Sequence, residues 1–541
     1  MNKKLIPSTL VLGLAPMLAV QSAAAPAPAK ENKRPNVIFI MSDDHTATSI
    51  GVYGSRLAGL NPTPTIDRIG NEGAIFSNCF CTNNISTPSR ACIVSGQYSQ
   101  TTGVLDLEDS LAISKQHLPM ELKKLGYQTA VIGKWHLKNQ PEQYDYYNVF
   151  YGQGEYFDPV LLEKGEKHIV KDYKFGKQKG LRGKRYIGHS SDIVMDITLD
   201  WMKNKRKKDQ PFFLDLHFKA PHDFFEFHPR YKEYLEDTFI PEPESMWDDQ
   251  NHGSVASRGY QDSLRDTIGS SVGKRNLIRN MGMHMEIDTA LSDDDYKRAA
   301  YQEYLKRYLR CVKGVDDNIA RLFQYLEEND LMDNTIIMYT GDQGFFLGEH
   351  DYIDKRWMYE EAMRMPFLVR YPEKIAAGTK VDAIVNNVDF APTIINMCGG
   401  ETPDYMQGDD FSEILYHNGE EPEDWKDVTY TRYGMHMAHK HSNPAHFGIR
   451  TKRYKLIFFY GCNYDETPQR DPMRQFKTPV AWEFYDLEND PMEMNNLYGD
   501  VRYKKVIADL KVKLMLERER LNETDVKYPH IQKVIEEHWN D

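Results

Sequence analysis

The sequence predicts an α/β protein with a large central mixed, mostly parallel sheet flanked by helices, followed by a smaller C-terminal α+β subdomain that contains an antiparallel sheet. Three observations lead to this fold class: apolar runs that end in polar residues, helical patterns between those runs, and a change of alternation after Gly399-Gly400. With 541 residues the chain exceeds the usual length of a single domain. We therefore expect one large domain and one smaller one.

Four apolar runs predict strands that are buried on both faces, because such strands have no polar alternation. These runs are residues 37–41, 129–132, 211–218 and 335–339. Helical patterns at 118–125 and 319–326 lie between the runs, as in an α/β sheet. Ligands of such sheets bind beyond the carboxyl ends of the strands, and polar residues follow each of the four runs.

The C-terminal part has a different pattern. Three short stretches alternate as in an antiparallel meander: 428–431, 447–450 and 454–459. Residues 503–516 have the pattern of a helix. We therefore place an N-terminal domain at 26–404 and a C-terminal subdomain at 405–541. The polar segment from about 230 to 300, with acidic residues at 293–295, is expected to form an insertion or lid.

The N-terminus predicts export. Residues 1–25 have the features of a secretory signal, with Lys3 and Lys4, an apolar stretch at 10–20 and small residues at 23–25. No later apolar stretch is long enough to cross a bilayer, so no membrane span is expected. These features predict an exported protein, in the periplasm or alternatively at the cell surface or secreted.

The bulk composition excludes two classes of site. A net charge of −13 argues against nucleic-acid binding, which normally needs a basic face. The six cysteines are scattered and show no spaced Cys/His pairs, so a metal–thiolate site has no support. We expect these cysteines to be mostly reduced.

Residues 86–96 read Ser-Thr-Pro-Ser-Arg-Ala-Cys-Ile-Val-Ser-Gly and predict an anion site. Pro88 fits the first turn of a helix, which places Ser86 at the helix mouth, where free backbone N–H groups favour an anion. Arg90 adds a positive charge one turn further on. This arrangement suits a tetrahedral oxyanion such as phosphate or sulfate. The alternative is a capped helix start with a surface arginine.

Oxygen ligands follow two of the predicted strands. Asp43 and Asp44 come after the first strand, and Asp342 and Gln343 come after the fourth. Carboxylate and amide oxygens suit Ca²⁺ or Mg²⁺ and not zinc, which prefers His and Cys. Taken singly, each pair is better explained as an ordinary turn or helix cap.

The run at Ser86 resembles the signature of the type I sulfatases, Cys/Ser-x-Pro-Ser-Arg followed by a small residue and Gly. The resemblance extends through landmarks at 63–67, 388–393 and 483–497, and covers about residues 35 to 500. It implies an alkaline phosphatase-like fold. It also implies that Ser86 is oxidised to formylglycine, whose hydrate is the nucleophile, by a bacterial sulfatase-maturating enzyme acting on the serine type.

The same resemblance implies the remaining roles. One Ca²⁺ per chain, or less favourably Mg²⁺, is expected on a set of oxygen ligands: Asp43, Asp44, Ser86, Asp342 and Gln343. In this set Gln343 replaces the more usual Asn. The expected catalytic residues are Ser86, Arg90, Lys134, His136, His222 and Lys355. His222, with Lys355, would neutralise the leaving alcohol, and His136 would take a proton from the hydrated aldehyde. Arg356 is the alternative to Lys355.

The expected substrate is a sulfated carbohydrate of the glycosaminoglycan or mucin type. Residues 358–361 and 446–451 look most like glycan sulfatases of gut bacteria, particularly those that remove 6-O-sulfate from N-acetylglucosamine. Candidate substrate-binding residues in the C-terminal part are His436, His446 and Arg450. The Lys-rich segment 164–185 predicts a solvated surface hairpin, with contact to a sulfated polymer as the alternative.

Two other functions stay open from the residues. One is a phosphomonoester or phosphonate hydrolase of the same superfamily that uses unmodified Ser86 and two metal ions. The other is a catalytically dead protein that binds glycans.

Overall fold

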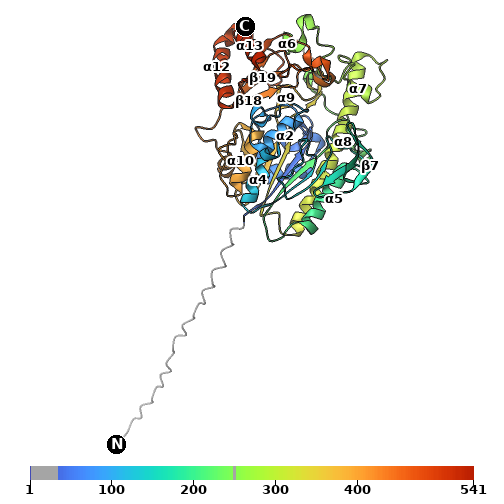
Figure 1. The fold of residues 1–541 in the computed structure, drawn as a ribbon, viewed down its shortest axis with the longest axis vertical. Helices are drawn as coiled ribbons and strands as arrows, with labels where there is room; N and C mark the ends of the chain where they lie inside the picture. The colour runs from blue at the N-terminus through green and yellow to red at the C-terminus, as the bar shows by residue number, and fades with distance from the viewer. Residues whose placement is uncertain (2–33, 248–250, 469) are drawn as a thin grey trace. The chain divides into compact units, whose positions relative to one another are not determined.

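A ten-stranded sheet runs through the computed structural model and carries helices on its two faces (Figure 1). The structure describes Met1 and residues 34–247, 251–468 and 470–541. The rest of the predicted signal peptide therefore lies outside the described residues. Arg34–Asp541 form one compact unit, and the boundary at residue 405 stays a prediction.

The strand order of this sheet is β16-β2-β15-β12-β1-β10-β4-β5-β6-β9. In chain order the strands are β1 (Asn36–Ser42), β2 (Ala74–Phe76), β4 (Gln128–Gly133), β5 (Tyr146–Phe150), β6 (Val160–Glu163), β9 (Lys184–Arg185), β10 (Phe212–Phe218), β12 (Thr335–Gly341), β15 (Phe367–Arg370) and β16 (Thr379–Val381). The five central strands, from β12 to β5, are parallel to one another. Antiparallel neighbours flank them on both sides, so the prediction of a mixed, mostly parallel sheet is confirmed.

The four predicted strands form β12, β1, β10 and β4, which are adjacent in the sheet. All residues of these strands are buried, as their apolar runs require. Side chains of β1 alternate between two apolar clusters, Phe39 and Met41 in one and Ile38 and Ile40 in the other. Because the strands run in parallel, their carboxyl ends meet at a single edge of the sheet.

Helices cover both faces. Side chains of α2 (Ser86–Ser95), α4 (His117–Lys124) and α10 (Phe390–Met397) enter the first cluster. Those of α1 (Pro64–Asn71), α5 (Ser190–Asp200) and α8 (Asp293–Glu328) enter the second. The helices predicted at 118–125 and 319–326 correspond to α4 and to the last part of α8.

The segment predicted as an insertion is made of short elements, among them α6 (Val255–Arg258), β11 (Ser270–Ser271) and α7 (Met281–His284). Its expected acidic end at 293–295 is instead the first turn of α8. The Ser292 hydroxyl accepts a hydrogen bond from the N–H of Asp295 at 3.2 Å. Negative side chains in the first turn interact favourably with the positive end of the helix dipole, which explains why this acidic run starts a helix.

The C-terminal meander is confirmed as an antiparallel sheet of order β18-β19-β20-β21. Its strands are β18 (Val428–Tyr433), β19 (His446–Thr451), β20 (Tyr454–Phe459) and β21 (Ala481–Asp486). The predicted helix at 503–516 is α12 (Lys504–Arg520), and α13 (Pro529–His538) follows it. Residues of both helices join the sheet in one apolar cluster, which also takes in Cys92, Tyr98 and Val388 from earlier in the chain.

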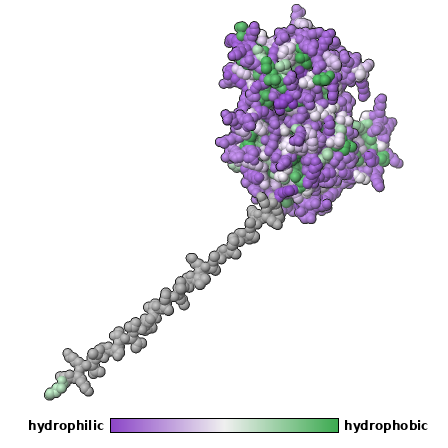
Figure 2. All heavy atoms as spheres, turned by 60° about the vertical axis from the view of Figure 1, so that its left-hand side comes forward, coloured by the Kyte–Doolittle hydropathy of each residue, from purple (hydrophilic) through white to green (hydrophobic). Residues whose placement is uncertain are grey.

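Further short strands and α-helices are also present. They are β3 (Cys79–Phe80), α3 (Ser99–Thr102), β7 (Ile169–Phe175), β8 (Gln178–Arg182), β13 (Phe346–Leu347), β14 (Tyr352–Asp354), α9 (Glu360–Met363), β17 (Val385–Asn386) and α11 (Ser412–Tyr416). The six cysteines are buried and free. The face drawn in Figure 2 is mostly hydrophilic, with apolar side chains in small groups. Among the described residues, no helix combines the length and apolar character needed to cross a membrane.

Candidate active site

Ser86 is the first residue of helix α2, as the position of Pro88 predicts. The residue is only 1% exposed. Its hydroxyl oxygen lies 3.4 Å from Oδ1 of Asp43 and 3.4 Å from Oε1 of Gln343. The mouth of the helix therefore faces oxygen atoms that come from two strand ends. The start of a helix favours an anion through its first backbone N–H groups and its dipole.

The two predicted pairs of oxygen ligands meet because β1 and β12 are neighbours. The backbone N–H of Asp44 donates to Oδ1 of Asp342 at 3.1 Å. The amide nitrogen of Gln343 donates to Oδ1 of Asp44 at 2.5 Å, so its amide oxygen is free to face Ser86. All four side chains are fully buried.

Three cationic side chains surround these carboxylates. Arg90 donates from Nε to Oδ2 of Asp342 at 3.0 Å and from Nη1 to the carbonyl of Lys134 at 2.6 Å. Lys134, which follows β4, donates to the carboxylate of Asp43. Lys355, which follows β14, lies 2.7 and 2.6 Å from the two carboxylate oxygens of Asp44. Within the described part of the chain, Nη2 of Arg90 is buried and has no hydrogen-bond acceptor.

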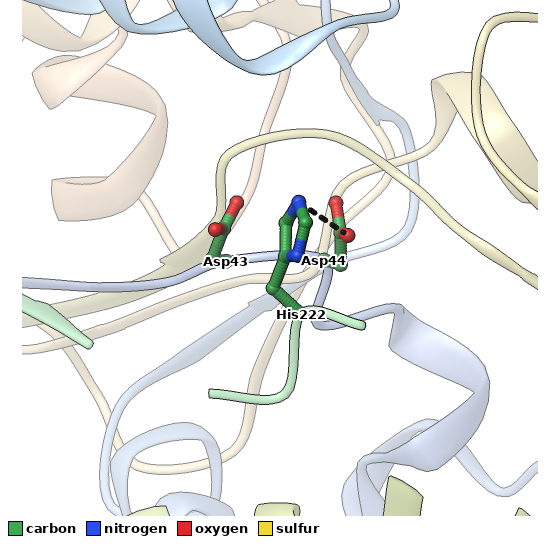
Figure 3. Close-up of side chains that lie close together, drawn as sticks. All are labelled: Asp43, Asp44 and His222. Carbon is green, nitrogen blue, oxygen red and sulfur yellow. Dashed lines mark ion pairs between the residues drawn. The ribbon is translucent and has the colours of Figure 1, made fainter. Parts of the chain in front are cut away.

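Two histidines lie at the rim of this cluster. The ring of His222 stands between the carboxylates of Asp43 and Asp44 in Figure 3, with Nε2 at 3.7 Å from Oδ2 of Asp44. Its Nδ1 is 2.6 Å from Oδ1 of Asp223. His136 lies next to the helix mouth, where the Thr87 hydroxyl donates to its carbonyl at 3.1 Å.

Burial sets the protonation of these groups. It raises the pKa of Asp44 to about 7, against the opposing effect of Lys355. Burial lowers the pKa of His222 to about 4, although Asp223 raises it. The pKa of His136 falls well below its usual range through burial and through the charges of Lys134 and Arg90. Both imidazoles are therefore neutral near pH 7 in the protein alone.

The residues present fit a divalent cation. Asp43, Asp44 and His222 can each offer a ligand atom, with these atoms within 4.8 Å of one another, and the nearby Asp342 and Gln343 add further oxygen atoms. The raised pKa of Asp44 means that its buried negative charge is incompletely neutralised, which a cation would remedy. A set dominated by carboxylate and amide oxygens suits a hard ion such as Ca²⁺ or Mg²⁺.

Lys355, and not Arg356, reaches the carboxylates. Arg356 instead donates to Asp354 at 3.0 Å and to the hydroxyl of Tyr433 at 3.0 Å. Two acids next to predicted residues were missed from the sequence, Asp223 beside His222 and Asp354 beside Lys355. Each acid is next to a basic residue in the sequence. Such neighbours are also common on protein surfaces, so the sequence alone does not mark them as part of a site.

The three predicted substrate-binding residues lie in the C-terminal sheet and make other contacts. The two ring nitrogens of His436 meet the carbonyl of Phe476 at 2.7 Å and the N–H of Ala445 at 3.0 Å. His446 is buried beside aromatic rings. Arg450 pairs with Glu360 at 3.1 Å. The structure does not bring these side chains to Ser86, and their role in substrate binding stays a prediction.

A cavity of about 130 Å³ opens next to the cluster. Asp223 and Asp354, which contact His222 and Lys355, form part of its wall. Residues of the insertion also line this cavity, among them Arg279, Asn280 and His284. A small polar molecule bound here would lie beside the carboxylates and their cations.

Comparisons with known proteins identify relatives of this chain. A family model described as Sulfatase matches residues 35–400, and one described as N-sulphoglucosamine sulphohydrolase, C-terminal, matches residues 348–520. The chain is 38% identical to an N-acetylglucosamine-6-O-sulfatase of Bacteroides thetaiotaomicron, over 93% of this chain and 89% of the relative. It is 27% identical to an N-acetylglucosamine-6-sulfatase of Capra hircus, over 72% of this chain and 64% of the relative.

Solved structures share the fold. One, described as a complex with its substrate D-glucosamine-2-N,6-O-disulfate, has a TM-score of 0.76 and 35% identity, covering 92% of this chain and all of the other. A phosphonate monoester hydrolase from Silicibacter pomeroyi has a TM-score of 0.67 at 19% identity, covering 90% and 95% of the two chains. The second likeness concerns the fold alone.

Proposed function

Because the chain belongs to the sulfatase family, we propose that it hydrolyses a sulfate ester on a carbohydrate, with the 6-O-sulfate of N-acetylglucosamine as the preferred substrate. The observation that carries the proposal is the meeting of Ser86, at a helix mouth, with buried carboxylates and three cations. The relatives named for N-acetylglucosamine 6-sulfate support the choice of sugar. The solved complex with a 6-O-sulfated glucosamine supports it too.

The cations of the cluster are placed to hold a sulfate group. Nη2 of Arg90 lies 3.7 Å from Oδ1 of Asp43 and has no hydrogen-bond acceptor in the described structure, so it can donate to a sulfate oxygen while Nε and Nη1 keep their hydrogen bonds. Lys134 and Lys355 are within reach of the same space, since each contacts a carboxylate near Ser86. Positive groups that are already in position stabilise the charge that develops on the oxygens during transfer.

Two groups supplied after synthesis complete the proposal. A formylglycine formed from Ser86 would supply a hydrated aldehyde as the nucleophile. A Ca²⁺ held by Asp43, Asp44, Asp342 and Gln343 would supply positive charge beside the sulfate.

The two histidines would move protons during the reaction. Asp223 fixes the ring of His222 through Nδ1 and leaves Nε2 to face the cluster, where it can protonate the leaving alcohol. A bound anion raises the pKa of a nearby imidazole, which would increase the protonated fraction of His222 above that of the free protein. His136 is neutral in the free protein and can accept a proton beside Ser86.

The test is sulfate release from 6-O-sulfated N-acetylglucosamine, N-acetylgalactosamine and galactose, with protein whose residue 86 is shown by mass to be formylglycine. We expect release from the N-acetylglucosamine compound and none from Ser86→Ala. Undiminished release by Ser86→Ala would overturn the mechanism. Hydrolysis of phosphonate or phosphate monoesters by unconverted protein with two bound cations would favour the phosphohydrolase. Saturable glycan binding without turnover by converted protein would favour a dead enzyme.

We also propose where the protein acts and which protein it needs for maturation. The signal-like residues 1–25 support export to the periplasm, where sulfated glycans of outside origin would be met. A maturating enzyme that converts Ser86 is the one protein partner that the mechanism requires.

A further inference from the structure

One surface segment carries a charge opposite to that of the protein as a whole. We call residues 164–185 the basic hairpin; they include β7, β8 and β9. The segment has nine Lys or Arg residues and two acidic residues, in a chain of net charge −13. All nine cations are exposed: Lys164, Lys167, Lys171, Lys174, Lys177, Lys179, Arg182, Lys184 and Arg185. In Figure 1, β7 lies at the outer edge of the ribbon on the right.

Most cations of the basic hairpin have no acidic partner in the described structure, although Lys164 donates to the carbonyls of Glu142 and Tyr144. Lys174 stands directly opposite Lys179 in the antiparallel pair. Like charges in this position destabilise a hairpin. Throughout the described parts of the chain, one ion pair involves a cation of the hairpin, that of Arg185 with Asp172 at 3.0 Å. The positive charge is therefore kept at some cost to stability and is open to an external anion.

One face of the basic hairpin is buried against the protein, and the other is exposed to solvent. Val170 and Tyr173 of β7 are buried against Val160 and Leu181, so this face fixes the hairpin to the protein. Lys171 and Lys174 are exposed to solvent, and Phe175, which packs on Tyr151 together with Tyr173, is still 41% exposed.

The basic hairpin adjoins the candidate active site through one loop. Tyr151 contacts the rings of Tyr173 and Phe175 and donates from its hydroxyl to the carbonyl of Arg182 at 2.7 Å. Two residues further on, the side chain of Gln153 accepts a hydrogen bond from Lys134. The Cα atoms of residues 151 and 153 cannot be more than about 7 Å apart. A chain molecule lying on the hairpin can therefore extend toward Ser86.

We propose that the basic hairpin is a second binding surface, separate from the catalytic pocket, for a sulfated polysaccharide that presents its end to the active site. This inference rests on the proposed function, because that function supplies a polyanionic carrier of the substrate. An array of exposed cations attracts a polyanion through local charge and through release of its counterions, so binding should weaken steeply with salt.

The test compares two triple variants with equal charge change. One replaces Lys174, Lys177 and Lys179 by Gln. The matched control replaces Lys504, Lys505 and Lys527, which are also exposed and have no carboxylate within 4.0 Å in the described structure. Affinity for immobilised heparin is measured at several salt concentrations, and sulfate release is measured on a 6-O-sulfated monosaccharide and on heparin.

We expect the hairpin variant to bind heparin at least tenfold more weakly and with a smaller salt slope than the wild type or the control. Its turnover of the monosaccharide should be unchanged, while its turnover of the polymer falls. Equal heparin affinity of the two triple variants would overturn the inference. Loss of binding to anionic phospholipid vesicles, with heparin binding unaltered, would also overturn it and point to a membrane surface. A failure of the proposed function appears separately, as absent monosaccharide turnover in the wild type.

Discussion

At the scale of single residues, Asp44 shows how one side chain and its backbone can organise a site. Its φ of 61° lies in the left-handed region, which Asp adopts more readily than most residues. In this conformation its N–H donates to Asp342, and its carbonyl accepts from the hydroxyl of Tyr308 at 2.8 Å. Its carboxylate is then aimed at Lys355 and Gln343. Backbone and side chain thus join three segments of the chain.

We expect Asp44→Asn to keep the fold but to lower kcat/KM for sulfate release by at least about 100-fold, which corresponds to about 2.7 kcal/mol. The substitution preserves volume while removing a charge that faces Lys355 and the expected cation. Initial rates and a calcium titration measure both effects. The control is Asp333→Asn, a carboxylate with 95% side-chain exposure. Normal rates together with normal calcium affinity would contradict the assignment of Asp44.

At the scale of elements, the adjacency of β12, β1, β10 and β4 decides where the site forms. Their apolar runs and the polar residues after them were recognisable in the sequence, because a strand buried on both faces leaves a continuous apolar signal. The side chains of the C-terminal sheet were not predictable in the same way. His446 and Arg450 are four residues apart on β19, so they share a face. In the structure His446 of this face packs on Trp357 and Arg450 pairs with Glu360. The sequence alone could not distinguish these internal contacts from contacts with a ligand.

A second contact between elements predicts how stability depends on pH. Asp316 of α8 accepts hydrogen bonds from the N–H groups of Thr65 and Ile66, at 2.9 and 2.8 Å, in the first turn of α1. Burial raises the pKa of Asp316 to about 6, although these hydrogen bonds lower it. The folded protein therefore holds a proton there at pH values at which the unfolded chain, with a pKa near 3.8, has lost it.

The contribution of Asp316 to stability is consequently greatest below pH 4, falls as the pH rises from 4 to 6, and is constant above that. The loss across this window is roughly 3 kcal/mol. We expect Asp316→Asn, which cannot ionise, to lack this component, so that its stability relative to the wild type rises between pH 4 and pH 6. Denaturant unfolding at pH 4, 5, 6 and 7 measures the difference. A difference that does not change with pH would show that the folded pKa is not raised.

At the scale of the whole molecule, the site draws its groups from residues 43 to 355 of a single compact unit. A cation bound by Asp43, Asp44, Asp342 and Gln343 would hold β1 and β12 together at their ends. Binding to the folded state alone stabilises a protein by about 2.7 kcal/mol at a ligand concentration one hundred times Kd.

We therefore expect removal of calcium with EGTA to lower Tm by a few degrees and to abolish sulfate release, with recovery of both on adding calcium. Differential scanning calorimetry and rate measurements on the same samples test this. The Asp44→Asn variant provides the control, since its Tm should respond little to calcium. An equal Tm with and without EGTA would mean that no cation is held by these residues in the folded protein.

The burial of Ser86 also sets an order of events. A residue with 1% exposure, on a helix whose ten residues are all buried, cannot enter the active site of another protein. An enzyme that converts Ser86 must therefore reach it on the nascent or unfolded chain, before α2 packs against the strand ends. Once α2 has packed, Ser86 can no longer be converted. A chain that folds before conversion would be stable and well formed but permanently inactive. The yield of active protein would depend on which of two rates is faster, conversion or folding.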